Sequence, residues 1–248
     1  MSNINLEQAE CHIFPIIKKI LTCINETKYI FVSGDSVAVR GYTPYKRDLE
    51  DIDLIFHKDT DINELKAFIL KKMPELIVRD FIELGNSNGF IRAKHKIDFC
   101  YEEEDAFIFD FHVGGSVYKG NFACEVDDLF FSKKSLKEVH SFGKFEKIEI
   151  PVSTIEEVIL FKLKKFIGND EVDIFSLLSC DFQIDFDYIA QRIEFYNKEL
   201  IYRNLNALFD NNKIKEEKIE RWIYEHKGIP FSDKMERKLK TNLKQLLA

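Results

Sequence analysis

Two aspartates separated by a single residue stand inside an apolar stretch of this sequence. The stretch is "DIDLIF", residues 51–56, and its hydrophobic residues predict a buried strand. Because successive strand side chains point to opposite faces, Asp51 and Asp53 project to the same side. Two neighbouring ionised carboxylates repel each other unless a cation compensates their charge. Paired oxygen ligands of this kind are typical of Mg²⁺ sites, so the stretch predicts a magnesium site.

Further acidic residues stand in apolar strand patterns later in the chain. Asp98 lies in "KIDFCY", and a strand beside "DIDLIF" would bring it to the same metal. Asp110 and His112 form another same-face pair, in "FIFDFHVGG". We interpret that second pair as a coincidence at the end of a sheet, with His112 lining a cleft as the alternative. The predicted metal ligands are therefore Asp51, Asp53 and Asp98.

A glycine-containing turn precedes the two aspartates. The short apolar run "YIFVS" predicts a strand that ends at Ser33 and Gly34, and the next residues predict the start of a helix. Backbone N–H groups at a helix start attract anionic oxygens, and glycine lets a phosphate approach closely. The hydroxyls of Ser33 and Ser36 add two more donors. This turn therefore predicts a phosphate-binding loop.

The segment "VSGDSVAVRGY…KRDLEDIDLIF" resembles the first motif of the nucleotidyltransferase superfamily related to DNA polymerase β. It is most similar to the branch of the AbiEii-type toxins, in which an arginine stands four positions before the first aspartate, as Arg47 does here. By the same resemblance, "KIDFCY" matches the strand of the third carboxylate. Further on, "IPVSTIEEVILFKLKKFIGNDEVDIFSLL" resembles the downstream element of the family. There, Lys162 takes the place of an inward lysine, and Asp170 and Asp173 that of an acid pair.

Some residues depart from the family pattern. Ser33-Gly34 replaces the usual Gly-Gly, Asp35 replaces a small hydroxyl residue, and Asn169 stands where a lysine commonly precedes the aspartate. The alternative interpretation of Lys162 is an ordinary solvent-facing lysine of a helix. The alternative interpretation of Asp170 and Asp173 is that they cap the next helix. The departures keep open a second hypothesis, a catalytically inactive nucleotide-binding module on the same fold.

The resemblance implies an enzyme, a Mg²⁺-dependent nucleotidyltransferase. It would move a nucleoside monophosphate from an NTP such as ATP to an acceptor hydroxyl and release pyrophosphate, using two Mg²⁺ ions. The acceptor classes are RNA (tRNA in particular), a protein or a small molecule, and the toxin branch implies an antitoxin partner. A Mg²⁺-dependent nuclease is a further alternative. The implied site residues are Asp51, Asp53, Asp98 and Lys162 for catalysis, and Ser33, Gly34, Ser36, Arg47 and Lys162 for the nucleotide.

The surrounding elements predict an α+β fold, a mixed β-sheet flanked by helices and followed by a helical C-terminal domain. We expect a nucleotidyltransferase-like domain over residues 1–150 and the helical domain over 151–248. Helix signals include Asp61 as an N-cap and a capping box beginning at Ser153 or Thr154. Residues 89–103 predict two strands that meet near Lys94 and His95. Helical patterns follow over 170–180, 187–209, 213–228 and 233–247.

Composition excludes several other classes of protein. The five cysteines form no paired spacing and the six histidines no metal-binding pair, which argues against a zinc hydrolase or a disulfide framework. No apolar run approaches the length of a membrane span and no signal region is evident, so we expect a cytoplasmic protein. The net charge is −7, although residues 213–248 carry +4. The acidic remainder argues against sequence-blind binding of nucleic acid, while the basic segment weakly favours an RNA acceptor.

Overall fold

The structure is a computed structural model that describes residues 6–34, 36–43, 51–84, 88–96, 106–118, 121–140, 147–167, 170–210 and 232–247. The chain divides into two compact units. The first contains Met1–Val37 and Asp48–Ser153, and the second contains Ala38–Arg47 and Thr154–Ala248. The domain boundary that we placed at residue 150 stays a prediction, and it did not include the short early segment that belongs to the second unit.

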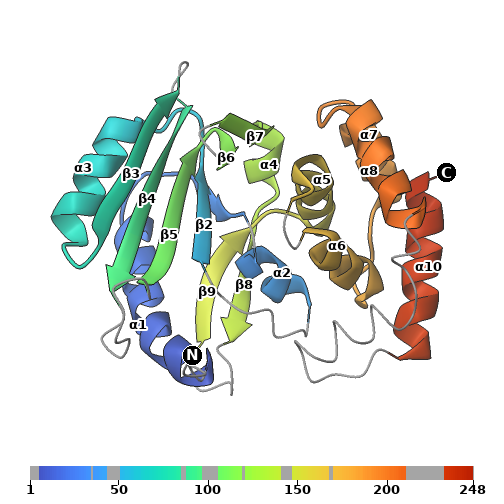
Figure 1. The fold of residues 1–248 in the computed structure, drawn as a ribbon, viewed down its shortest axis with the longest axis horizontal. Helices are drawn as coiled ribbons and strands as arrows, with labels where there is room; N and C mark the ends of the chain where they lie inside the picture. The colour runs from blue at the N-terminus through green and yellow to red at the C-terminus, as the bar shows by residue number, and fades with distance from the viewer. Residues whose placement is uncertain are drawn as a thin grey trace. The chain divides into compact units, whose positions relative to one another are not determined.

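The first unit is built on a seven-stranded mixed sheet, in the order β3-β4-β5-β2-β1-β9-β8 (Figure 1). Strand β2 lies at its centre, antiparallel to β1 and parallel to β5. This arrangement confirms the predicted α+β class. The strands are β1 (Phe31–Ser33), β2 (Asp51–Phe56), β3 (Ile77–Leu84), β4 (Asn88–Lys96), β5 (Ala106–Val113), β8 (Ser135–His140) and β9 (Lys147–Val152).

The alternation of side chains gives the central strands two different faces. On β2, Ile52, Leu54 and Phe56 are buried on one face, while Asp51 and Asp53 point to the other. The neighbouring strand β5 repeats the pattern, with aromatic residues on the first face and polar residues on the second. The sheet therefore buries one apolar face and gathers its acidic side chains on the opposite one.

Helices and a small hairpin complete the first unit. Helix α1 (Leu6–Asn25) contacts β9, and α3 (Ile62–Lys72) contacts β4 (Figure 1). Asp61 is the N-cap of α3, as predicted, and its carboxylate accepts hydrogen bonds from two backbone N–H groups at 2.8 and 3.1 Å. Strands β6 (Gly115–Tyr118) and β7 (Asn121–Glu125) form a separate two-stranded sheet, and β6 contacts β2, β4 and β5. Helix α4 (Asp128–Ser132) follows.

Strand β4 corrects one expectation. We predicted a strand junction near Lys94 and His95, but β4 continues through both residues and pairs with β5 as far as Lys96 opposite Ala106. The antiparallel pairing with β5 runs without a break from Gly89 opposite Val113 to Lys96 opposite Ala106.

The second unit is helical. It contains α5 (Ile155–Lys165), α6 (Asp170–Ser179), α7 (Phe186–Arg192), α8 (Lys198–Asp210) and α10 (Asp233–Leu247). Most of α2 (Ser36–Tyr42) also belongs to it. Thr154 caps α5 and accepts a hydrogen bond from the Glu157 backbone N–H at 3.4 Å, which confirms the N-cap of the predicted capping box, while the Glu157 carboxylate binds Arg192, Tyr188 and Tyr196 instead of the Thr154 N–H. Across the described residues, no helix is both long enough and apolar enough to span a membrane.

The predicted helix over residues 187–209 is two helices. Helix α7 ends at Arg192, and α8 begins at Lys198. Asn197, just before α8, has a φ of 69°, a left-handed conformation that asparagine tolerates better than most residues do. Its side-chain oxygen accepts a hydrogen bond from the Leu200 N–H at 3.1 Å. The break is therefore a turn followed by a newly capped helix.

Candidate metal centre

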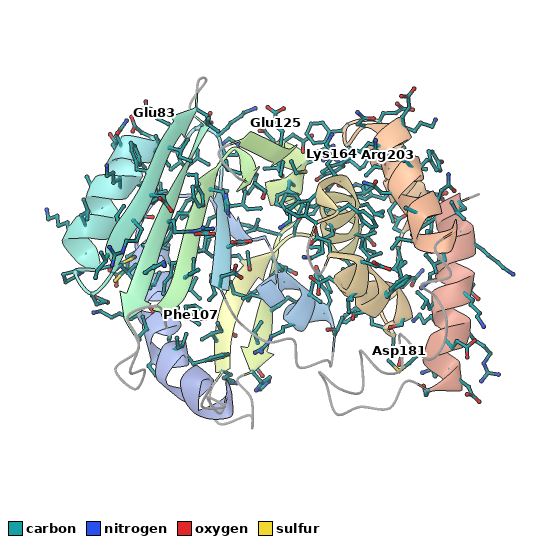
Figure 2. All side chains as sticks on the ribbon, viewed as in Figure 1. Glu83, Phe107, Glu125, Lys164, Asp181 and Arg203 are labelled. Atoms are coloured by element: carbon teal, nitrogen blue, oxygen red, sulfur yellow. The ribbon has the colours of Figure 1, made fainter. Side chains whose placement is uncertain are left out.

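Three potential metal ligands meet on the acidic face of the sheet. Because β2 and β5 are parallel neighbours, Asp53 lies directly opposite Asp110, and Ile55 lies opposite His112. Asp53, Asp110 and His112 each offer one ligand atom, and these atoms lie within 4.8 Å of one another. Figure 2 labels Phe107 near the start of β5. By strand alternation, Asp110 and His112 point to the face opposite Phe107. Adjacent parallel strands therefore build a cluster that can hold a metal ion.

The cluster corrects our interpretation of Asp110 and His112. Both lie within β5 rather than beyond its end, and both are buried. Both face Asp53, with ligand atoms of the three side chains within 4.8 Å of one another, so the pair belongs to the acidic cluster and not to a sheet end. The same pattern that drew attention to Asp51 and Asp53, polar residues alternating inside an apolar strand, was present here too. What the sequence did not reveal was that β5 lies beside β2.

Asp110 is held by an arginine from the next strand. Arg92 on β4 lies opposite Asp110 and donates two hydrogen bonds to it, Nε to Oδ1 at 2.9 Å and Nη2 to Oδ2 at 2.6 Å. This two-pronged contact raises the pKa of Arg92, mainly through its hydrogen bonds to Asp110. The guanidinium fixes the plane of the carboxylate and offsets part of the negative charge that would otherwise repel Asp53.

His112 is fixed on three sides. Its Nδ1 accepts a hydrogen bond from the Val117 backbone N–H of β6 at 3.1 Å. Its ring lies 5.0 Å from the ring of Phe90, and its Nε2 lies 3.6 Å from Asp53 Oδ1. The imidazole is almost fully buried, whereas the side chain of Asp53 retains 12% exposure. These contacts hold the His112 ring in one orientation beside Asp53.

Gly34 lies against the same part of the sheet. Its backbone N–H donates to the Asp53 carbonyl at 3.0 Å. A Cβ atom at this position would lie 2.5 Å from Ile55 Cδ1 and 3.9 Å from Asp53 Cβ. Any larger residue would displace the packed Ile55 side chain, so glycine is what allows β1 to end this close to the acidic strand.

The other residues of the predicted phosphate-binding loop are placed only in part. The register puts Ser33 opposite Leu54, on the sheet face away from Asp53. The Ser33 Oγ is buried, with no hydrogen-bond partner among the described residues. Ser36 is the first residue of α2, and its side chain lies outside the described part of the structure. The part played by this loop in phosphate binding stays a prediction.

Two predicted site residues, Arg47 and Asp98, lie outside the described part of the chain. Their proposed roles therefore stay predictions.

Asp51 is the first residue of β2 and shares the face of Asp53. The residue opposite Asp51 on β5 is the apolar Ile108. Carboxylates that converge in this way suit a hard divalent cation, because Mg²⁺ prefers oxygen ligands and pairs with one or two carboxylates. Asp53 and Asp110, with Asp51 beside them, fit such an ion.

Lys162 belongs to the second unit, where it is completely buried. Its Nζ lies 3.1 Å from Asp170 Oδ1 and 2.8 Å from Asp173 Oδ2, two carboxylates of the first turn of α6. Asp170 Oδ2 also accepts a hydrogen bond from the Ile167 N–H at 2.9 Å. The lysine that we expected to face inward therefore ties α5 to α6 through both acids, and Asp170 also binds the backbone that leads into the helix.

Comparison with known proteins identifies the fold. No protein-family model and no curated protein matches the chain. Among solved structures, the chain is similar to JHP933 from Helicobacter pylori, with a TM-score of 0.51 and 15% identity over 99% of this chain and 95% of that one. It is equally similar to a "putative nucleotidyltransferase from H. pylori", with a TM-score of 0.51 and 15% identity over 98% and 97% of the two chains. The likeness spans nearly all of each chain, so this protein has the mixed sheet and helical C-terminal region of a nucleotidyltransferase-like fold.

Proposed function

We propose that this protein is a metal-dependent nucleotidyltransferase. The observation that carries the proposal is the meeting of Asp53 and Asp110 on one face of adjacent parallel strands, with Asp51 on the same face and Gly34 against the acidic strand. The nucleotidyltransferase-like fold supports the same reading, since the sheet that holds these acids is shared with that class.

The proposed reaction moves a nucleoside monophosphate from an NTP to an acceptor hydroxyl. The acceptor oxygen forms a bond to the α-phosphorus, and the bond between this phosphorus and the oxygen bridging to the β-phosphate breaks. Pyrophosphate leaves with that electron pair, and the hydroxyl proton passes to water. Bound Mg²⁺ supplies charge neutralisation for the phosphates and lowers the pKa of the attacking hydroxyl.

The residues of the chain have separate tasks in this proposal. Asp51, Asp53 and Asp110 hold the cations on the acidic face of the sheet. Arg92 keeps the Asp110 carboxylate in one orientation through its two hydrogen bonds. Gly34 lets the chain that leaves β1 lie close to β2, and backbone N–H groups of the turn that follows would bind the triphosphate. These groups act by position and charge, which is the main requirement of phosphoryl transfer.

Three further roles rest on the family resemblance alone. Asp98 would add a carboxylate to the site or assist removal of the hydroxyl proton, and Arg47 would bind the triphosphate. Lys162 would also offset phosphate charge, although its two ion pairs support a structural task in the second unit first. Replacement of Lys162 by methionine separates these roles, because a phosphate ligand would change the KM for NTP whereas a purely structural lysine would change stability.

The acceptor and the biological setting also belong to the proposal. The charge of +4 carried by residues 213–248 weakly favours RNA, and the resemblance to the toxin branch adds tRNA as a specific candidate. A protein hydroxyl and a small molecule are the other classes. Membership of the toxin branch would add an antitoxin as partner, and co-expression with the product of a neighbouring gene would test for one by restored growth.

One labelling experiment tests the reaction. The purified protein is incubated with Mg²⁺, each α-labelled NTP in turn, and either total RNA or a protein extract. We expect label to join a macromolecule in the wild-type reaction and in Asp59→Asn, an exposed aspartate just after β2. We expect Asp53→Asn to lose about a thousandfold in rate, since loss of a metal-binding carboxylate removes about 4 kcal/mol of transition-state stabilisation.

The same experiment distinguishes the alternatives. Shortened RNA without incorporated label would indicate a nuclease that uses the same acids. Saturable binding of NTP with no release of pyrophosphate would indicate the inactive nucleotide-binding module. Equal labelling by the wild-type protein and Asp53→Asn would contradict the proposed site, provided that circular dichroism shows both to be folded.

A further inference from the structure

His112 stands among the potential metal ligands, but its hydrogen bonds assign it a different task. We propose that His112 is a positioning residue, which presents an N–H group to the metal-binding carboxylate of Asp53 and does not itself bind the metal. This inference rests on the proposed metal site, and it adds to that site a residue that the family motifs did not include.

The first step of the argument is the proton on the imidazole ring. A ring nitrogen that accepts a hydrogen bond carries no proton, and Nδ1 accepts one from the Val117 backbone N–H at 3.1 Å. A neutral imidazole with an unprotonated Nδ1 has its proton on Nε2. The nitrogen that faces Asp53 is therefore a donor, and a protonated ring nitrogen has no lone pair in the plane of the ring to give to a metal.

The second step is a comparison with histidines that do bind metals. A metal-binding histidine almost always donates its second N–H to a carboxylate, a backbone carbonyl or a water molecule. His112 has the reverse arrangement, because its second nitrogen accepts from a backbone amide. If the proton moved from Nε2 to Nδ1, the Nδ1–H of His112 would face the Val117 N–H in a buried position, and the hydrogen bond from Val117 would be lost.

The third step is the rigidity of the ring. The imidazole is buried and lies against Phe90, so it has no room to turn its other edge to the cluster. Nε2 lies 3.6 Å from Asp53 Oδ1, which is longer than a hydrogen bond. Such contacts commonly shorten when the site is loaded. A cation bound by Asp53 would hold its carboxylate in place, and the His112 N–H then secures the oxygen that does not face the ion.

The test is spectroscopic and needs no nucleotide. Protein labelled with ¹⁵N-histidine is examined by long-range proton–nitrogen NMR, and His112→Gln identifies the signal of this residue among the six histidines. We expect the pattern of the Nε2–H tautomer both without and with Mg²⁺. With Mn²⁺ in place of Mg²⁺, electron spin echo spectra should show no directly coordinated nitrogen. An Nδ1–H tautomer, or a strong nitrogen coupling that disappears in His112→Gln, would overturn the proposal.

A pair of variants measures the strength of the effect. Glutamine retains an N–H donor near the position of Nε2, whereas phenylalanine fills the space without one. We expect His112→Phe to weaken Mn²⁺ binding by about 10–100-fold, the usual range for a residue that orients a ligand, and His112→Gln to recover part of that loss. Complete loss of the ion in both folded variants would instead indicate a ligand.

The outcome is separable from that of the proposed function. The tautomer and the Mn²⁺ spectrum are measured without NTP, so they stand whether or not label is transferred. A wild-type protein that binds no Mn²⁺ would contradict the metal-dependent function, and it would contradict the role of His112 as well, since no ion would then require the carboxylate to be held.

Discussion

Each unit of this protein buries acidic side chains, but it surrounds them differently. In the second unit, Glu157 is fully buried on α5, and four protein donors serve its two oxygens. Arg192 Nε and the Tyr188 hydroxyl contact Oε1 at 2.6 Å, while Tyr196 and Arg192 Nη2 contact Oε2 at 2.5 and 3.3 Å. This carboxylate is saturated by the protein itself, so it holds helices together.

The acids of the first unit are arranged against one another instead. Asp53 faces Asp110 across neighbouring strands, and Asp51 shares their face. Arg92 binds Asp110, and the side chain of Asp53 keeps some contact with solvent. Like charges at this spacing destabilise the fold unless a cation joins them. The comparison teaches that burial alone does not mark a functional acid; what distinguishes the acids of the sheet is that carboxylates of adjacent strands face one another.

The largest difference should appear when one acid of each kind is neutralised. We expect Glu157→Gln to lower the free energy of unfolding by about 3–5 kcal/mol, because Arg192 would be left as an uncompensated buried charge. Asp53→Asn should leave stability unchanged or raise it, since it relieves repulsion with Asp110. Urea denaturation of both variants measures the contrast. Glu199→Gln, an exposed change on α8, is the matched control and should shift stability by less than about 0.5 kcal/mol.

A loss of stability in Asp53→Asn as large as that in Glu157→Gln would contradict this contrast between the two units. If Asp53→Asn unfolded as readily as Glu157→Gln, the acids of the sheet would be structural and the proposed metal site would lose its main physical argument.

The two arginines provide a smaller test of the same contrast. Arg192 and Arg92 each bind a carboxylate through two nitrogens, but Arg192 is buried whereas the side chain of Arg92 is 38% exposed. Lysine retains the charge and loses the two-pronged geometry. We expect Arg192→Lys to cost about 1.5–3 kcal/mol of stability and Arg92→Lys less than about 1 kcal/mol. In the proposed enzyme, Arg92→Lys should instead act on the rate of transfer.

Thermal unfolding and the labelling reaction together check this expectation. Equal losses of stability in the two variants would show that exposure does not separate them.

The smallest effect concerns a surface ion pair and its dependence on pH. Asp128 lies 3.1 Å from His57 Nε2 and 3.3 Å from Lys58 Nζ, and its hydrogen bond to His57, followed by that to Lys58, lowers the pKa of Asp128. A carboxyl group with a lowered pKa in the folded state stabilises the fold above its unfolded pKa of about 3.9, and this contribution is lost as the pH falls through the folded value.

Asp128→Asn should therefore be slightly less stable than the wild type at pH 7, and the difference should vanish in strongly acidic solution. Denaturation curves at pH 7 and at a series of pH values below the unfolded pKa measure it. A difference that grew towards acidic pH would contradict the assigned cause.

Features that depend on neighbouring residues were predictable from the sequence. Asp61 and Thr154 cap their helices as expected, because a helix cap is decided within four residues. The shared face of Asp51 and Asp53 follows from strand alternation in the same way. The inward orientation of Lys162, which the family resemblance implied, agrees with its burial on α5.

Features that depend on distant pairing were not predictable. Asp110 reaches Asp53 only because β5 pairs with β2, although β3 and β4 lie between them in the chain. Alternation shows which way a side chain points but not which strand lies beside it, so we chose Asp98 as the third carboxylate and interpreted Asp110 as a coincidence. The break at Asn197 was missed because an apolar helical pattern runs on both sides of a single turn.

The second unit includes ten residues, Ala38–Arg47, that precede most of the first unit in the chain. Within it, the rings of Tyr42 and Phe182 lie 5.4 Å apart, although Phe182 follows Tyr42 by 140 residues. At about 5–20 residues per second, a ribosome needs roughly 7–28 s to travel between the two codons. During that interval the nascent chain carries an early segment whose partners have not been synthesised, so translation speed has a direct bearing on how this protein acquires its final form.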